Sequence, residues 1–171
     1  MASGWLLDSF NKKGVKVIIL KGVALAKTVY CDIGLRPVGD IDLLIKKEDF
    51  THVEKIMSEL GYLFQSNKSP EWYIENHYHI EYTNQEKNIP VEIHWHIASK
   101  LNPLRICKLD TNIIESWWEG AKAIKFSDRN ALMLCPEDLI LYMCLHFLVV
   151  VQFSCYLFTK GNLLGNFTNR S

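Results

Sequence analysis

The segment Gly39-Asp40-Ile41-Asp42-Leu43-Leu44-Ile45 has the pattern of an apolar strand with carboxylates at two alternate positions. Side chains of a strand point alternately to its two faces, so Asp40 and Asp42 are predicted to share one face. Two carboxylates this close repel each other unless a positive charge lies between them. A hard divalent cation that carries a substrate phosphate, Mg²⁺ or Mn²⁺, meets that need. Because Asp-x-Asp is short and common, the pair is also consistent with a strand end that merely carries two acids.

The composition is that of one ordinary globular domain. The 171 residues are 49% hydrophobic and 22% charged, and 19 basic side chains balance 19 acidic ones. This balance argues against a broad nucleic-acid-binding surface. The five cysteines are scattered without a CxxC pair, which indicates reduced thiols, and the start of the chain lacks a signal-peptide pattern. We therefore expect a cytoplasmic protein.

A candidate phosphate-binding turn precedes the acidic strand. The apolar run of residues 15–20 predicts a strand, Lys21 and Gly22 follow it, and residues 23–30 have a helical pattern. A glycine between a strand and a helix lets a backbone N–H group approach a phosphate. Taken alone, Gly22 is more typical of a plain tight turn. In the following loop, Arg36 can reach a phosphate, pair with the acidic strand or fix its own loop.

Beyond the acids, a helix is expected from residue 48 to residue 60, followed by a β-hairpin. Residues 77–82 resemble a strand, residues 84–88 form a polar turn, and residues 91–97 alternate sharply between apolar and polar side chains. Two strands joined by a short polar turn are expected to pair in antiparallel fashion.

The polar face of the second hairpin strand carries Glu92, His94 and His96. Such a face can simply be solvated. Alternatively, it can form a zinc site if a further ligand such as His77 or His79 joins it.

In the last third of the chain, residues 113–121 are predicted to form a helix or a segment that crosses the surface. Pro136-Glu137-Asp138 is predicted to start a helix at Leu139. Residues 139–158 contain no Asp, Glu, Lys or Arg and are long enough to span a bilayer. Because His146 and other polar residues interrupt this run and its start is acidic, we favour a core helix and do not expect a membrane segment.

In their order along the chain, these motifs resemble the uncharacterised nucleotidyltransferase family of the DNA-polymerase-β-like nucleotidyltransferase superfamily. The resemblance runs from about residue 15 to about residue 146. It rests on Leu20-Lys21-Gly22, Gly34-Leu35-Arg36-Pro37, Gly39-Asp40-Ile41-Asp42-Leu43-Leu44, Glu92-Ile93-His94-Trp95, Pro136-Glu137-Asp138-Leu139 and Leu145-His146.

The resemblance implies an α/β (α+β) fold, with a small mixed β-sheet flanked by helices. It places a nucleotidyltransferase-like domain at residues 1–130 and a C-terminal helical segment at residues 131–171. The implied reaction transfers a nucleoside monophosphate from an NTP to an unidentified acceptor hydroxyl and releases pyrophosphate, with Mg²⁺ or Mn²⁺ as cofactor. The implied catalytic residues and metal ligands are Asp40, Asp42 and Glu92, and the implied nucleotide-binding residues are Lys21, Gly22, Arg36 and His94.

In this scheme Glu92 completes a second metal site or takes the proton of the acceptor. The chain departs from the superfamily pattern because Val23 follows Gly22 and because Asp40 lies farther from that glycine than is usual. Its start and end are short for the family, which is typical of a fragment or an alternative product. The alternative function is a catalytically inactive binding or regulatory module, antitoxin-like, with the same fold. The base of the NTP, the acceptor and the oligomeric state are not encoded in these motifs.

Overall fold

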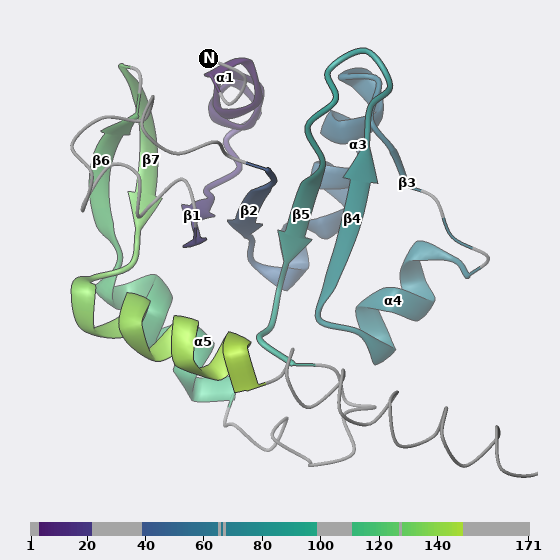
Figure 1. Cartoon of the computed structure of the whole chain (residues 1–171). Helices are drawn as coiled ribbons and strands as arrows, with labels where there is room; N and C mark the ends of the chain where they lie inside the picture. The colour runs from purple at the N-terminus through teal and green to yellow at the C-terminus, as the bar shows by residue number, and fades with distance from the viewer. Residues whose placement is uncertain are drawn as a thin grey trace, which may run out of the picture.

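The computed structural model describes residues 4–21, 39–64, 66, 68–98, 111–126 and 128–148. Within this part of the chain, one mixed sheet contains β1 (Ile18–Ile19), β2 (Ile41–Leu44), β3 (Leu63–Phe64), β4 (His79–Thr83), β5 (Val91–His94), β6 (Lys122–Phe126) and β7 (Arg129–Met133). The strand order is β3-β4-β5-β2-β1-β7-β6 (Figure 1).

The centre of the sheet pairs β2 with β5 in parallel, and this pairing positions the acidic residues. In the ladder Asp42 lies directly beside Glu92, and Leu44 lies beside His94. Strand β1 runs antiparallel to β2 and parallel to β7, whereas β4 runs antiparallel to β5. The sheet is therefore mixed, as the sequence predicts.

Helices lie on both sides of the sheet (Figure 1). They are α1 (Gly4–Lys12), the short 3₁₀ helix η2 (Lys47–Asp49), α3 (Phe50–Glu59), α4 (Pro70–Asn76), α5 (Thr111–Gly120) and a helix over residues 136–148.

The alternation of the strands divides the core into two clusters. Ile19 and Leu43 face the cluster that contains the buried side chains of α1 and α3. Ile18 and Leu44 face the opposite cluster, which also holds Trp117 of α5 and residues from the 136–148 helix. Asp42 belongs to the same face as Leu44, so the acidic residues lie on the side covered by α5 and the 136–148 helix.

Several predicted elements are confirmed, with shorter strands than the sequence suggests. The acidic strand, the helix that follows it and the hairpin between β4 and β5 are all present. The strand expected at residues 91–97 ends at His94, because the N–H groups of Trp95 and His96 both donate to the carbonyl of Tyr78. In the run of residues 15–20, the sheet pairing is limited to the two residues of β1.

Helix α4 and strands β3 and β7 were not predicted from the sequence. Helix α4 begins at Pro70 because the Ser69 hydroxyl accepts a hydrogen bond from the Trp72 N–H at 3.3 Å. Strand β3 is only two residues long, which is too short for a visible alternation.

Three predictions concern residues that lie wholly or partly outside the described part of the chain. The helix expected at residues 23–30 and the loop that contains Arg36 lie outside the described residues. The same holds for residues 149–158 of the long apolar run, while its described part is helical and buries Leu139 and Tyr142. Among the described residues, no helix combines the length and the apolar character needed to cross a membrane. The division of the chain at residue 130 stays a prediction.

Candidate active site

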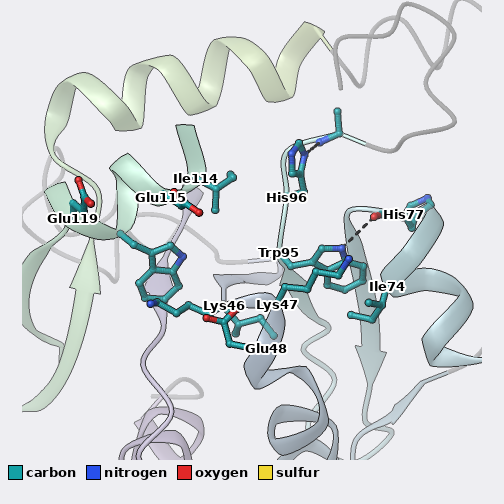
Figure 2. Close-up of a pocket in the computed structure, with 13 residues that line it drawn as sticks. Lys46, Lys47, Glu48, Ile74, His77, Trp95, His96, Ile114, Glu115 and Glu119 are labelled. Carbon is teal, nitrogen blue, oxygen red and sulfur yellow. Dashed lines mark hydrogen bonds between the residues drawn. The ribbon is translucent and has the colours of Figure 1, made fainter. Parts of the chain in front are cut away.

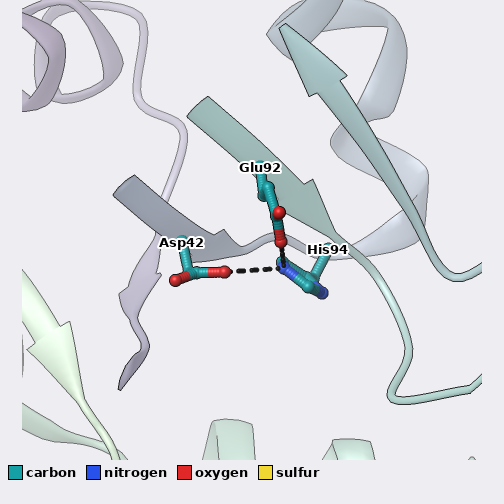
Figure 3. Close-up of side chains that lie close together, drawn as sticks. All are labelled: Asp42, Glu92 and His94. Atoms are coloured by element: carbon teal, nitrogen blue, oxygen red, sulfur yellow. Dashed lines mark hydrogen bonds and ion pairs between the residues drawn. The ribbon is translucent and has the colours of Figure 1, made fainter. Parts of the chain in front are cut away.

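Three side chains from the two central parallel strands meet on one face of the sheet. Asp42 of β2 and Glu92 of β5 are neighbours in the ladder, and His94 follows Glu92 by two residues, so all three project to the same side (Figure 3). One ligand atom from each lies within 4.8 Å of the others. Figure 3 shows the His94 ring bridging the two carboxylates.

The cluster also contains a lysine ammonium. Lys21 Nζ lies 2.6 Å from Asp42 Oδ1 and 3.5 Å from Glu92 Oε2. His94 Nε2 lies 3.1 Å from an oxygen of each carboxylate, and because both neighbours only accept, this nitrogen donates. Lys21 has a φ of +39°, in the left-handed region that few non-glycine residues adopt. Lys21 lies two residues after the end of β1, and its side chain contacts Asp42 of β2.

Burial and neighbouring charges shift the pKa values of Glu92 and Asp40 in opposite directions. Asp42 is 1% exposed, and it forms hydrogen bonds with Lys21 and His94. The hydrogen bond from His94 lowers the pKa of Glu92, and the Lys21 ammonium lowers it further against the opposing effect of burial. For Asp40, burial raises the pKa, and the neighbouring charge of Asp42 adds to this effect. The charges of Asp42, Lys21 and Glu92 all act on Asp40, so Asp40 interacts with the cluster electrostatically.

Neutral polar groups surround the charged cluster. His79 of β4 pairs with His94 in the ladder, and the two rings stack with centroids 5.1 Å apart. Burial lowers the pKa of His79 to about 3, and the neighbouring His94 contributes. In the 136–148 helix, burial raises the pKa of Tyr142 far above its ordinary value and lowers the pKa of His146 to about 4. These side chains stay neutral at pH 7, so they add no charge to the cluster.

The structure brings four of the predicted site residues together: Lys21, Asp42, Glu92 and His94. Asp40 lies just before β2, is half-buried, and is not one of the three residues whose ligand atoms converge. The two remaining predicted residues, Gly22 and Arg36, lie outside the described residues.

The proposed histidine pair of a zinc site does not form. His96 Nδ1 accepts the Ala98 N–H at 3.3 Å, and its ring lines a separate pocket. Within the described part of the chain, the group of possible metal ligands contains His94 but not His96, because the strand bends after His94. Sequence alternation alone placed both histidines on one face.

Sequence reasoning missed Tyr142 and His146 as neighbours of the cluster. The two lie one helical turn apart, with ring centroids separated by 5.8 Å. The available signal was the position of His146 within an otherwise apolar run, because a polar side chain on the buried side of a helix needs a polar neighbour.

The donor set of the cluster suits a divalent cation. Two carboxylate oxygens and an imidazole nitrogen converge, and the Lys21 ammonium already marks a position where a positive charge is stabilised. Carboxylates are ligands for Mg²⁺ and Mn²⁺, and the imidazole suits Mn²⁺ and other transition metals. Asp42, Glu92 and His94 are therefore the residues that can hold a metal here, and His94 does so once its Nε2 gives up the proton that it donates to the carboxylates.

Comparisons with known proteins identify a family and a related fold. The profile of a family described as uncharacterised nucleotidyltransferase matches residues 4–154, and the chain belongs to this family. Among solved structures, the lincosamide antibiotic adenylyltransferase LnuA, with lincomycin bound, has a TM-score of 0.51 at 15% identity, over 82% of each chain. A Thermotoga maritima protein described as a candidate nucleotidyltransferase has a TM-score of 0.45 at 17% identity, over 98% of this chain and 90% of that one. The curated proteins yielded no match.

The family match and the likeness to LnuA confirm two of the predictions made from the sequence. The chain is a member of the family that its motifs resemble, and its mixed α/β fold is a nucleotidyltransferase fold.

Proposed function

We propose that this protein is a Mg²⁺- or Mn²⁺-dependent nucleotidyltransferase that transfers a nucleoside monophosphate from an NTP to an acceptor hydroxyl. The observation that carries the proposal is the pairing of Asp42 with Glu92 across adjacent parallel strands, with a lysine ammonium against both carboxylates. Membership of a nucleotidyltransferase family supports the same reaction class.

In the proposed reaction, Asp42 and Glu92 hold the cation, with Asp40 as an additional ligand. The bound ion would neutralise charge on the triphosphate and hold it against the cluster. The acceptor oxygen forms a bond to the α-phosphorus, and the bond from that phosphorus to the β-phosphate bridging oxygen breaks. Pyrophosphate leaves, and the acceptor proton passes to a carboxylate of the cluster, for which Glu92 is the candidate.

Lys21 has a second role in this proposal. A metal ion and the Lys21 ammonium compete for the same carboxylate oxygens, because both are attracted by the same negative charge. When the cation binds, the ammonium is free to move to the triphosphate, which is a common partner of lysine. Gly22 and Arg36 are the further phosphate contacts that the family resemblance implies. We place this activity in the cytoplasm and in the domain formed by residues 1–130.

The test is incubation of the protein with each labelled NTP and Mg²⁺ or Mn²⁺, with and without lincomycin as a trial acceptor, followed by measurement of pyrophosphate release. Asp42→Asn should abolish release, whereas Asp128→Asn, a matched change in the exposed β6–β7 turn, should leave it unchanged. Equal activity of the two variants would contradict the assigned role of Asp42.

The alternative, an inactive module, predicts a different result in the same experiment. Metal-dependent binding of a non-hydrolysable NTP, measured by calorimetry, would occur without any label transfer. Absence of both turnover and metal-dependent binding would overturn the nucleotidyltransferase proposal.

A further inference from the structure

A cavity of about 600 Å³ lies beyond the carboxyl ends of β2 and β5 (Figure 2). Its walls include Ile45 and Trp95, which follow these strands, and Ile114 and Trp118 of α5. His77, which follows α4, lies at another side of the cavity. The volume is in the range of sites that hold small molecules, and it is larger than one nucleobase fills.

The cavity adjoins the acidic cluster along the chain. Trp95 directly follows His94, and Ile45 lies three residues after Asp42. At a rise of about 3.3 Å per residue, the cavity begins about 10 Å from Asp42. Ligands of open α/β sheets bind beyond the carboxyl ends of the strands, which is where this cavity lies. The ring of His77, which lines the cavity, lies 5.0 Å from the ring of His79, and His79 stacks on His94 at 5.1 Å. A small molecule in the cavity can therefore extend past His77 toward the cluster.

The aromatic wall of the cavity is held in place by its own contacts. Trp95 is 5% exposed, its indole N–H donates to the His77 carbonyl at 3.1 Å, and its ring packs edge-on against Phe50. On the opposite wall, the ammonium of Lys46 lies 5.8 Å from the centroid of the Trp118 ring. Two tryptophans fixed in this way favour a ligand with an apolar or flat body.

The charges around the cavity limit the ligand further. Three exposed carboxylates, those of Glu48, Glu115 and Glu119, accompany the two ammonium groups of Lys46 and Lys47. This excess of negative charge disfavours a polyanion such as a nucleic acid or the triphosphate of an NTP. An uncharged or positively charged molecule fits better.

We propose that this cavity binds the acceptor of the transfer reaction, and that the acceptor is a small uncharged or cationic molecule with an apolar body and a hydroxyl group. The inference rests on the proposed function, because only that function requires an acceptor. The apolar body lies between Trp95 and Trp118, and the hydroxyl points toward the acidic cluster.

The first test uses calorimetry on the full chain with two probes of this chemistry, tyramine and octyl β-glucoside. Ile114→Trp should fill the cavity and weaken binding of the probes at least tenfold. Ile140→Trp is the control, because Ile140 is 64% exposed on the 136–148 helix, and it should bind as the wild type does. Failure of both probes to bind the wild type at millimolar concentration would overturn the proposal, as would equal binding by the two variants.

A second variant guards against misfolding of Ile114→Trp. The double change Glu115→Gln/Glu119→Gln alters two exposed side chains of α5. It should weaken the binding of tyramine at least threefold and leave the affinity for octyl β-glucoside unchanged. An equal effect on both probes, or none, would contradict the charge argument.

Binding of a non-hydrolysable ATP analogue with Mg²⁺, measured on the same proteins, separates this proposal from the proposed function. We expect Ile114→Trp to keep nucleotide binding. Loss of nucleotide binding with retained probe binding would show that the cavity holds the nucleotide and would overturn the acceptor assignment. If the probes bind in an Ile114-dependent manner but no NTP binds or reacts, the proposed function fails while the ligand cavity stands.

Discussion

Replacement of Lys21 by methionine tests the electrostatics of the cluster most directly. The change removes the ammonium that lies 2.6 Å from Asp42 and leaves a buried carboxylate that is 1% exposed. Loss of one partner of a buried ion pair costs about 3–5 kcal/mol. Because the Lys21 side chain is 21% exposed and His94 still donates to Asp42, we expect a smaller loss, about 2 kcal/mol. For a domain of this size, that loss lowers the melting temperature by about 4–8 °C.

The same variant should respond more strongly to metal than the wild type does. The Lys21→Met variant has no ammonium at this position to compete for the carboxylate oxygens. Mg²⁺ or Mn²⁺ can therefore bind without first displacing a lysine side chain. A metal present at about 100 times its dissociation constant stabilises the folded state by about 2.7 kcal/mol, which is enough to offset the stability lost in Lys21→Met. Thermal unfolding in EDTA and in each metal measures both effects.

Lys13→Met provides the matched control. Lys13 Nζ lies 3.2 Å from Glu59 Oε2, but these side chains are 50% and 47% exposed, so the pair contributes about 0.5 kcal/mol and should be indifferent to metal. If Lys21→Met melts within a degree or two of Lys13→Met, Lys21 does not stabilise Asp42. If metal stabilises the wild type and Lys21→Met equally, the idea of competition between ammonium and metal is wrong.

Three further predictions concern stability. Burial, with Lys21 and His94 nearby, lowers the pKa of His146 from its ordinary 6.5 to about 4, so the unfolded state takes up this proton first. Stability should therefore fall as the pH drops from 6.5 to 4, by on the order of 1 kcal/mol for this half-exposed ring, and His146→Phe should flatten that part of a pH series of melting curves. Gly61→Ala should cost about 1–2 kcal/mol in urea unfolding, because Gly61 has a φ of +75° and the new Cβ would lie 3.2 Å from Asn84 Nδ2. Tyr142→Phe should leave stability unchanged or raise it by up to about 1 kcal/mol, because among the described residues the buried hydroxyl has no hydrogen-bond partner.

Two of these predictions have a matched control variant, and the third has an outcome that would contradict it. His52, an exposed histidine, should give an unchanged pH series when replaced by phenylalanine, and a flattening equal to that of His146→Phe would contradict the assignment. Gly14→Ala meets open space at a φ of +74°, so it should cost less than Gly61→Ala. A loss above 1 kcal/mol in Tyr142→Phe would reveal a hydrogen bond at the hydroxyl.

The sequence was most informative where alternation extends over several residues. In the sequence, acids recur at alternate positions around Asp42, and apolar and polar residues alternate around Glu92, so the acidic faces of both strands could be predicted without a structure. The motif order also indicated the family. A strand of two residues, such as β1 or β3, offers no alternation, and its place in the sheet follows from tertiary contacts alone.

The neighbours of the cluster could not be predicted, because the site combines elements whose contacts are set by packing. The 136–148 helix brings Tyr142 to the acidic face together with Leu139, and these side chains bury apolar surface against Trp117. A helical pattern identifies one apolar side of such a helix but not the strand face that it covers. The link between Tyr142 and the cluster therefore appears only in three dimensions.

The same distinction applies to the three acids that the sequence predicts for the site, Asp40, Asp42 and Glu92. Asp40 and Asp42 share a face, but alternate residues of a strand lie about 6.6 Å apart along the chain, at a rise of about 3.3 Å per residue. Glu92 lies across the ladder from Asp42, and neighbouring strands are only about 4.8 Å apart. The carboxylate from the adjacent strand is therefore the nearer one, and Lys21 and His94 contact this cross-strand pair. Sequence alternation indicates the face on which a cation can bind, whereas strand register determines which carboxylates share it.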